Sequence, residues 1–426
     1  MSRTSYALTI TSRAETVCRN PGSTRQSPAG PIIFSAGSAS PSWPLDCESG
    51  MPLPQPRVGK SLEFHVYPSC TNEGTLGSPE TIVWSSIQHL CSRAAADWLA
   101  WNIHKISKKR DRAALAANVK LYIQHASEFY RAAAMAKPNT APLIYYYAFL
   151  NLAKALCEIK KPRLHERSEC YSHGLSWRPN PRKVVDLRTE SVKIVGRGMW
   201  HALWESLMLN PCPAANPTKL PIRSLFSYCP EISSEFFRVF GFPGYSLIDL
   251  EKPNIRHDEH TAEVWLRFSV PRWGLSSRRI YAPQLLRQLA TARSGYVEVS
   301  STNEESRRFE SATPKALGRR EPPWLALETD ILGINTFTLL DINGKLNYFV
   351  PVQRRMPLPL PQLVVSYTIL FWLGSLVRYD PHSVRWLIDS EYWVLIDGFM
   401  SQSRLWLLEL FEWALYRDET TLCALR

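Results

Sequence analysis

The chain has 426 residues, of which 45% are hydrophobic and 21% charged, a balance typical of a folded globular protein and not of a disordered one. Fifty basic residues against 38 acidic ones give a net charge of +12, which favours polyanionic partners such as RNA. This excess is spread along the chain, so a generally basic surface is the simpler interpretation. The longest apolar run, residues 363–377, is shorter than the ~20 residues that a bilayer-spanning helix needs. We therefore expect no transmembrane segment and, without a secretory signal pattern, a cytoplasmic protein.

Nine cysteines are spread over the chain, and no two of them form a C-x-x-C pair or show zinc-ligand spacing. Reduced thiols are the simplest expectation. Residues 256–260, RHDEH, gather two histidines and two acids, which we interpret as a solvated loop before a strand because no further ligands are placed. No phosphate-loop, G-x-S-x-G or H-E-x-x-H pattern occurs, so we predict neither a metal nor a cofactor.

The first 60 residues are rich in Ser, Thr, Pro and Gly and show no periodic apolar pattern. Such a segment buries too little apolar surface to offset the entropy of ordering it, so we expect disorder. Its arginines and scarce acids superficially resemble an organellar transit peptide. The simpler hypothesis is that translation begins at Met51, which N-terminal sequencing of the natively expressed protein would test.

Helical patterns lie on both sides of a middle section that favours strands. Apolar residues three and four apart predict three early helices, over residues 78–106, 110–136 and 139–159. Three late helices are expected over residues 363–377, 381–397 and 402–416. Between them, strands are expected over 261–270 and 294–301. A hairpin is expected over 337–352, where Asn343–Gly344 separates two apolar runs.

These patterns predict a mainly α (α+β) fold, in which the early and late helices form one bundle around a smaller β-containing section. We divide the chain into a disordered extension, an N-terminal helical portion, a β-containing section with a hairpin and a C-terminal helical portion, at residues 1–60, 61–250, 251–356 and 357–426.

The segment YYYAFLNLAKAL, residues 145–156, has two plausible interpretations. Tyr145, Phe149 and Leu152 fall on one apolar stripe of the predicted helix, while Tyr146 and Asn151 fall nearer its other side. Buried tyrosines usually keep their hydroxyls paired locally, so a core helix is the simpler interpretation. The alternative is that hydroxyl and amide groups point into a cleft.

The segment PLIYYYAFLNLAKAL is followed by SHGLS (172–176) and, far downstream, by GSLVRYDPHSVRWLI (374–388). In this order and pattern the chain resembles the YaaC-like protein family over roughly residues 61–420. The resemblance brings no established activity with it. It marks six candidate binding residues, Tyr146, Tyr147, Asn151, Lys154, Arg378 and Tyr379.

A tyrosine-rich helix followed by a basic turn with a histidine is more distantly similar to HEPN domains, helical bundles common in toxin and phage-defence proteins. Some of these domains cut RNA without metal and carry an arginine shortly before a histidine. Arg167 and His173, with five residues between them, fit that spacing. The resemblance implies that His173 takes a proton from a ribose 2′-OH, that Arg167 stabilises charge on the phosphate, and that the site is shared across a homodimer.

Other features favour a structural role for this motif. About two or three such Arg–His spacings are expected by chance in a chain so rich in arginine, and one is found. Ser168 follows the arginine where nuclease members carry an amide or an acid. Gly174 predicts a turn, where a hydrogen-bonded structural histidine is the simpler interpretation. Arg378 likewise has two interpretations, a partner for a buried acid at a helix corner or an anion contact beside His173.

Two functions therefore remain open. The first is a nucleic-acid-directed, RNase-like relative of HEPN domains that acts on RNA or another polyanion in defence or stress. The second is a non-catalytic interaction or scaffold protein, suggested by fifteen tryptophans and the lack of a complete catalytic pattern. In either case we expect the early and late motifs to lie side by side.

Overall fold

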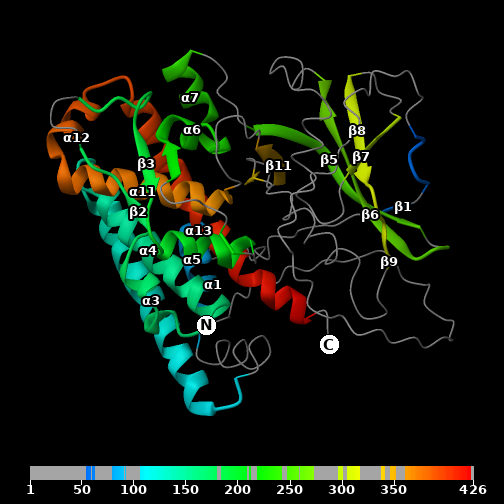
Figure 1. Ribbon diagram of the computed structural model, residues 1–426, viewed down its shortest axis with the longest axis horizontal. Helices are drawn as coiled ribbons and strands as arrows, with labels where there is room; N and C mark the ends of the chain where they lie inside the picture. The colour runs from blue at the N-terminus through cyan, green and yellow to red at the C-terminus, as the bar shows by residue number, and fades with distance from the viewer. Residues whose placement is uncertain are drawn as a thin grey trace, which may run out of the picture.

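The computed structural model describes the following residues, to which all structural statements below refer: 54–58, 60–62, 79–90, 92, 106–179, 184–208, 211–212, 218–241, 247–258, 260–272, 296–300, 305–316, 337–340, 346–351 and 360–423. They form a helical body and a separate antiparallel sheet, which lie on opposite sides of the molecule in Figure 1. The predicted mainly α architecture with a smaller β-containing section is confirmed.

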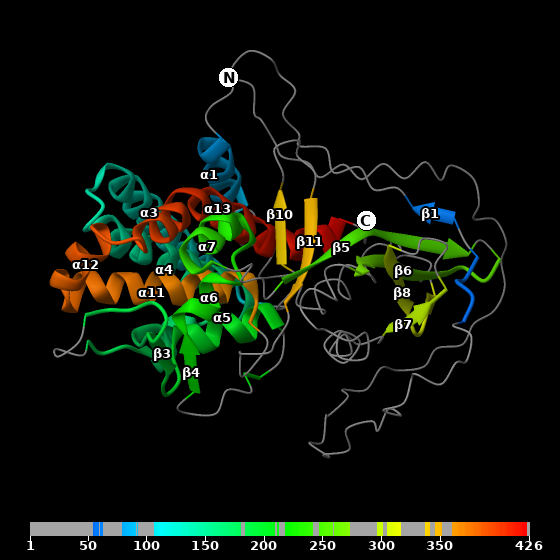
Figure 2. The same cartoon turned by 90° about the horizontal axis from the view of Figure 1, so that it is seen from above.

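The helical body joins early and late parts of the chain. Its main helices are α1 (Pro79–Leu90), α3 (Lys109–Met135), α4 (Ala141–Lys160), α5 (Met199–Met208), α11 (Gln362–Tyr379), α12 (Pro381–Ile388) and α13 (Trp393–Cys423). In Figures 1 and 2, α11 lies alongside α4 although some 200 residues separate them. The expectation that the early and late motifs are neighbours is therefore confirmed.

Smaller elements complete the helical body. They are the short helices α6 (Ile222–Phe226) and α7 (Ser233–Phe240) and a three-stranded antiparallel sheet of β2 (Leu175–Ser176), β3 (Ser191–Ile194) and β4 (Thr218–Pro221). The turn that precedes β2 carries His173 and follows two short 3-10 helices, Leu164–Glu166 and Ser168–Tyr171, which come after α4.

The second sheet is antiparallel throughout and follows the order β10-β11-β5-β6-β8-β7, with β1 paired to β5 and β9 to β6. Its strands are β1 (Lys60–Leu62), β5 (Leu247–Asp258), β6 (Glu263–Pro271), β7 (Tyr296–Val299), β8 (Ser306–Ser311), β9 (Lys315–Ala316), β10 (Phe337–Leu340) and β11 (Leu346–Pro351). The pairing of β10 with β11 confirms the predicted hairpin, while its turn at Asn343–Gly344 lies outside the described residues.

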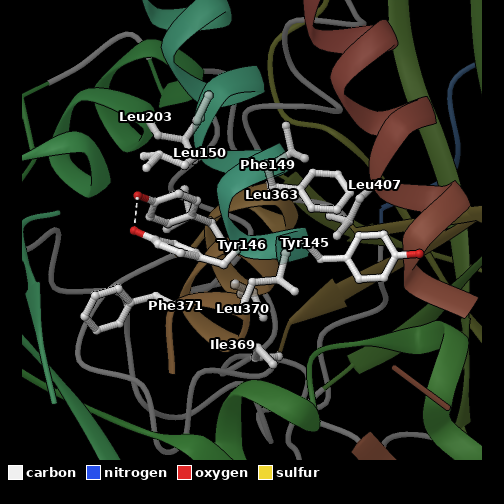
Figure 3. Packing of buried hydrophobic residues seen from close by; sticks show 14 of the residues in the cluster. Tyr145, Tyr146, Phe149, Leu150, Leu203, Leu363, Ile369, Leu370, Phe371 and Leu407 are labelled. Carbon is white, nitrogen blue, oxygen red and sulfur yellow. Dashed lines mark hydrogen bonds between the residues drawn. The ribbon is translucent and has the colours of Figure 1, made fainter. Parts of the chain in front are cut away.

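Helix α4 follows the local signals of its sequence. Thr140 precedes its first turn and Pro142 lies within it, where the missing proline N–H costs no hydrogen bond. The helix is apolar on most sides, and Figure 3 shows Tyr145 and Tyr146 pointing to different sides of it. Both rings are buried, so the core interpretation of these two tyrosines is confirmed.

Helix α11 is buried along nearly its whole length, which explains why its sequence is apolar on all sides. Gly374 allows it to approach α4 closely, because a Cβ there would lie 3.2 Å from the Cβ of Tyr146. Despite this apolar character, none of the described helices combines the length and hydropathy needed to cross a bilayer.

The late helices differ from the predicted boundaries. The structure ends α12 at Ile388 and runs α13 without a break from Trp393 to Cys423, whereas the sequence predicted one helix over 381–397 and another over 402–416. Gly398 lies inside α13, where a Cβ would come within 3.0 Å of Glu235 on α7. Close packing thus overrides low helix propensity at this position.

Candidate functional site

One face of α4 carries three of the candidate residues. Tyr147, Asn151 and Lys154 follow one another at intervals of four and three residues, which places them along one side of a helix. The Asn151 Nδ2 atom donates to the Tyr147 carbonyl at 2.8 Å, one turn back on the same helix.

A second set of polar groups begins at Tyr146, the residue directly before Tyr147 on α4. The Tyr146 hydroxyl lies 2.6 Å from Nδ1 of His173 and 3.3 Å from the hydroxyl of Tyr367 on α11. The dashed line in Figure 3 marks the contact between the two tyrosine hydroxyls at the buried end of Tyr146. This chain of three residues connects the core of the helical body with the histidine of the SHGLS turn.

The turn that carries His173 is fixed by a close backbone approach. Gly174 has a positive φ of 70°, and a Cβ on Gly198 would lie only 2.2 Å from the Gly174 nitrogen. The Ser172 hydroxyl donates to the Arg197 carbonyl at 2.6 Å, and the His173 carbonyl accepts from the Trp200 backbone N–H at 3.1 Å. The imidazole is therefore presented by a rigid turn, and the turn predicted at Gly174 is confirmed.

Arg378, near the end of α11, contacts Tyr147 on the neighbouring helix α4. Its guanidinium donates to the hydroxyl of Tyr147 and, at 3.2 Å, to the hydroxyl of Tyr379. It also lies 5.6 Å from the Tyr147 ring centre and 5.4 Å from the Tyr379 ring centre, within cation–π range. The structure thus brings Tyr146, Tyr147, His173, Arg378 and Tyr379 into contact with one another, while Asn151 and Lys154 lie on the following turns of α4. We call these seven residues the Tyr147–Arg378 cluster.

The cluster is rich in positive charge and poor in acids. Arg378 and Lys154 form no ion pair within the described part of the chain, so the alternative of a buried acid opposite Arg378 is not what the contacts show. Lys154 instead places its ammonium 5.7 Å from the ring centre of Tyr122 on α3. Two cations without a carboxylate partner form a natural site for an anion.

These charges and the surrounding protein act together on His173. Burial, and then the positive charges of Arg378 and Lys154, lower the pKa of its imidazole below the ordinary value, so the ring is neutral at pH 7. Burial raises the pKa of Tyr146 well above its usual range, so that hydroxyl stays protonated. With Nδ1 occupied by Tyr146, Nε2 is the ring nitrogen left for a ligand.

The direction of the Tyr367–Tyr146–His173 hydrogen bonds decides what Nε2 offers to a ligand. If Tyr146 donates to Nδ1, Nε2 carries the ring proton and donates to an anion. If Nδ1–H donates to Tyr146, the Nε2 lone pair is free to take a proton from a hydroxyl. The first direction gives both buried tyrosine hydroxyls an acceptor and suits binding, whereas the second suits general-base chemistry.

Arg167 stands apart from these contacts. It is an exposed residue between two short 3-10 turns, Leu164–Glu166 and Ser168–Tyr171, and only its backbone forms hydrogen bonds within the described chain. The cations that influence His173 are Arg378 and Lys154 instead. A catalytic role for Arg167 and His173 together therefore stays a prediction.

Sequence reasoning missed several residues that contact the cluster, among them Tyr367 and Phe129. Tyr367 lies in the apolar run of α11, where the one tyrosine among residues 363–377 was the available signal of a buried hydrogen bond. Phe129 on α3 packs its ring 5.7 Å from that of Tyr147, and its partial exposure had no sequence signal of its own.

Comparison with known proteins identifies one relationship. A family model described as YaaC-like Protein matches residues 85–414, which is well over half of the chain and includes every residue of the cluster. No curated protein and no solved structure matches the chain.

Proposed function

This chain belongs to the YaaC-like protein family, and we propose that it is a nucleic-acid-directed protein that holds an RNA phosphate against Lys154, His173 and Arg378. The observation that carries the proposal is the pair of cations without acidic partners, which lies beside an imidazole nitrogen left open by Tyr146. An RNA phosphate supplies the negative charge and acceptor oxygens that such a set of donors prefers.

The overall charge supports RNA over a small anion. A net charge of +12 attracts a polyanion from a distance and steers it to the surface. Guanidinium and ammonium groups contribute differently there, because Arg378 presents a planar fork of donors while Lys154 acts as a point charge. Both contacts release counterions, so RNA binding should weaken as the salt concentration rises.

A binding assay over a range of salt concentrations tests this proposal. We expect Lys154→Gln and Arg378→Gln each to weaken binding of the full chain to RNA and to lower the salt-dependence slope by about one phosphate contact. Lys193→Gln, on the exposed side of β3, is the matched control and should change neither quantity. Equal salt slopes for all three variants and the parent would contradict the proposal, and absence of RNA binding would leave the scaffold function as the alternative.

The lowered pKa of His173 favours a second candidate, metal-free RNA cleavage of the HEPN type. A neutral imidazole next to cations is poised to accept a proton from a ribose 2′-OH, while Arg378 stabilises negative charge on the phosphate. In this candidate Arg378, and not only Arg167, fills the electrostatic role that the distant resemblance implies.

Incubation of total RNA with the full chain and EDTA tests cleavage separately from binding. Cleavage by the parent and by His89→Ala, an exposed histidine on α1, but not by His173→Ala, would support the catalytic candidate. Intact RNA in all lanes, together with salt-sensitive binding, would leave a binding protein. Association into a homodimer, which the HEPN resemblance implies, is measurable in the same preparations by sedimentation.

A further inference from the structure

Aromatic rings continue the Tyr147–Arg378 cluster across three helices. Phe129 on α3 contacts the Tyr147 ring at 5.7 Å, Tyr147 contacts Arg378 at 5.6 Å, and Arg378 contacts the Tyr379 ring at 5.4 Å. The four side chains therefore form an unbroken row, which we call the Phe129–Tyr379 row.

The two ends of this row are open to solvent. Phe129 is 38% exposed and Tyr379 is 56% exposed, whereas Tyr145 and Tyr146 on the same helix as Tyr147 are almost fully buried. Tyr379 is the last residue of α11 and is not part of the buried core. The next residue, Asp380, begins α12 by accepting from the backbone N–H of Ser383. Arg378 orients the Tyr379 ring through its hydroxyl, so an exposed aromatic face is held beside an unpaired cation.

A cation flanked by aromatic rings, with a second cation nearby on α4, has a specific chemical complement. The phosphates of a nucleic acid strand meet the cations, and an unpaired base stacks on an aromatic face, which tolerates any base. A double helix keeps its base faces stacked inside and offers only phosphates to such a surface. An acidic peptide would use the cations but has no need of the rings.

We propose that the Phe129–Tyr379 row binds single-stranded RNA, with phosphates on Arg378 and Lys154 and an unstacked base on the Tyr379 ring. This inference rests on the proposed function and narrows its substrate class. It predicts a selectivity that the cations alone do not give, because phosphates are common to single and double strands.

The test compares three ligands on the full chain by fluorescence anisotropy: a single-stranded RNA oligonucleotide, a blunt RNA duplex of the same length, and inorganic polyphosphate as a competitor without bases. We expect Tyr379→Leu to weaken single-strand binding by about 5- to 100-fold, the range typical of a lost base stack. Binding of the duplex and competition by polyphosphate should change by less than about twofold, since their phosphates are held by the cations.

Matched variants keep the outcomes distinct. Phe237→Leu, an exposed phenylalanine on α7 outside the row, should leave all three affinities unchanged. Equal effects of Tyr379→Leu on single and double strands, or no effect on either, would overturn the stacking proposal. If Arg378→Gln still weakened all three ligands in that case, the proposed RNA function would survive without stacking, whereas failure of every RNA ligand to bind would reject both.

Discussion

Basic side chains of the sheet are paired with a buried acid, whereas two basic side chains of the helical body have no acidic partner in the described chain. In the sheet, the guanidinium groups of Arg57 and Arg267 close on the carboxylate of Glu310, which is 1% exposed, and Arg267 Nε donates to it at 2.6 Å. In the Tyr147–Arg378 cluster, the cations contact only tyrosine groups. The difference separates charge that is neutralised by an acid within the fold from charge that has no acidic partner in the described chain.

The largest effect on stability is expected where the charges are paired. Glu310→Ala would leave the largely buried Arg267 without its acid, which costs about 3–5 kcal/mol of unfolding free energy. Arg378→Gln should change that free energy by less than about 0.5 kcal/mol, because its side chain is exposed and has no acid to lose. Urea unfolding followed by tryptophan fluorescence measures both. Equal destabilisation by the two variants would break the comparison, and Glu298→Gln, at the half-exposed Arg307 pair, provides the control.

A smaller effect is expected where the backbone positions the site. Gly198→Ala would push a Cβ into the Gly174 backbone, an overpacking cost of about 1–3 kcal/mol, and should also lower RNA affinity because the His173 turn must move. Gly196→Ala is the matched control, since its positive φ of 57° is strained but nothing lies within 4 Å of the new Cβ. It should cost stability and leave RNA affinity unchanged. Thermal denaturation and anisotropy together distinguish the two, and a loss of affinity in both variants would contradict the assignment.

The smallest effect concerns pH, and it has opposite signs for stability and for binding. The pKa of His173 is lower in the folded chain than the ordinary 6.5, so below pH 6.5 the unfolded chain takes up the proton first. The contribution of His173 to stability is thus fully present above pH 6.5 and falls as the pH drops toward its folded pKa. RNA affinity should rise over the same range, because an imidazolium adds a third cation to the cluster.

His173→Asn should flatten the rise in RNA affinity and remove part of the fall in stability. Part of the loss of stability at low pH should remain in this variant, because burial also lowers the pKa of His201 and His201 is unchanged. Unfolding curves and RNA titrations between pH 5 and 8 provide the measurement. If the RNA affinity of the parent did not change with pH, His173 would not be part of the binding site.

Much of the architecture was predictable from local sequence patterns. The three- and four-residue apolar spacing predicted α3 and α4, and the two apolar runs around Asn343–Gly344 predicted the pairing of β10 with β11. The boundary between α12 and α13 was not predicted; at this boundary the hydroxyl of Tyr392 donates to Asp186, which is 206 residues away in the sequence. Local propensity does not report such a contact.

The site was predictable as a set of residues but not as a geometry. The resemblance singled out Tyr147 and Arg378, yet it did not say that Arg378 would bind a tyrosine hydroxyl in place of an acid. The hydrogen bonds that link Tyr367, Tyr146 and His173 depend on the packing of α11 against α4, two segments more than 200 residues apart. Which acceptor a side chain contacts depends on this packing, and the spacing of residues along the chain does not reveal it.

The short strand β1 has a consequence for how this protein can be divided into fragments. β1 covers one edge of β5 at Ile255–His257, and the neighbouring Arg57 donates to the carbonyls of Ser311 and Ala312. A fragment cut to the family-matched residues 85–414 would lose both and leave unpaired N–H and C=O groups along β5. Exposed strand edges recruit strands from other molecules, so such a fragment should self-associate, whereas a chain that begins before residue 54 keeps the edge closed.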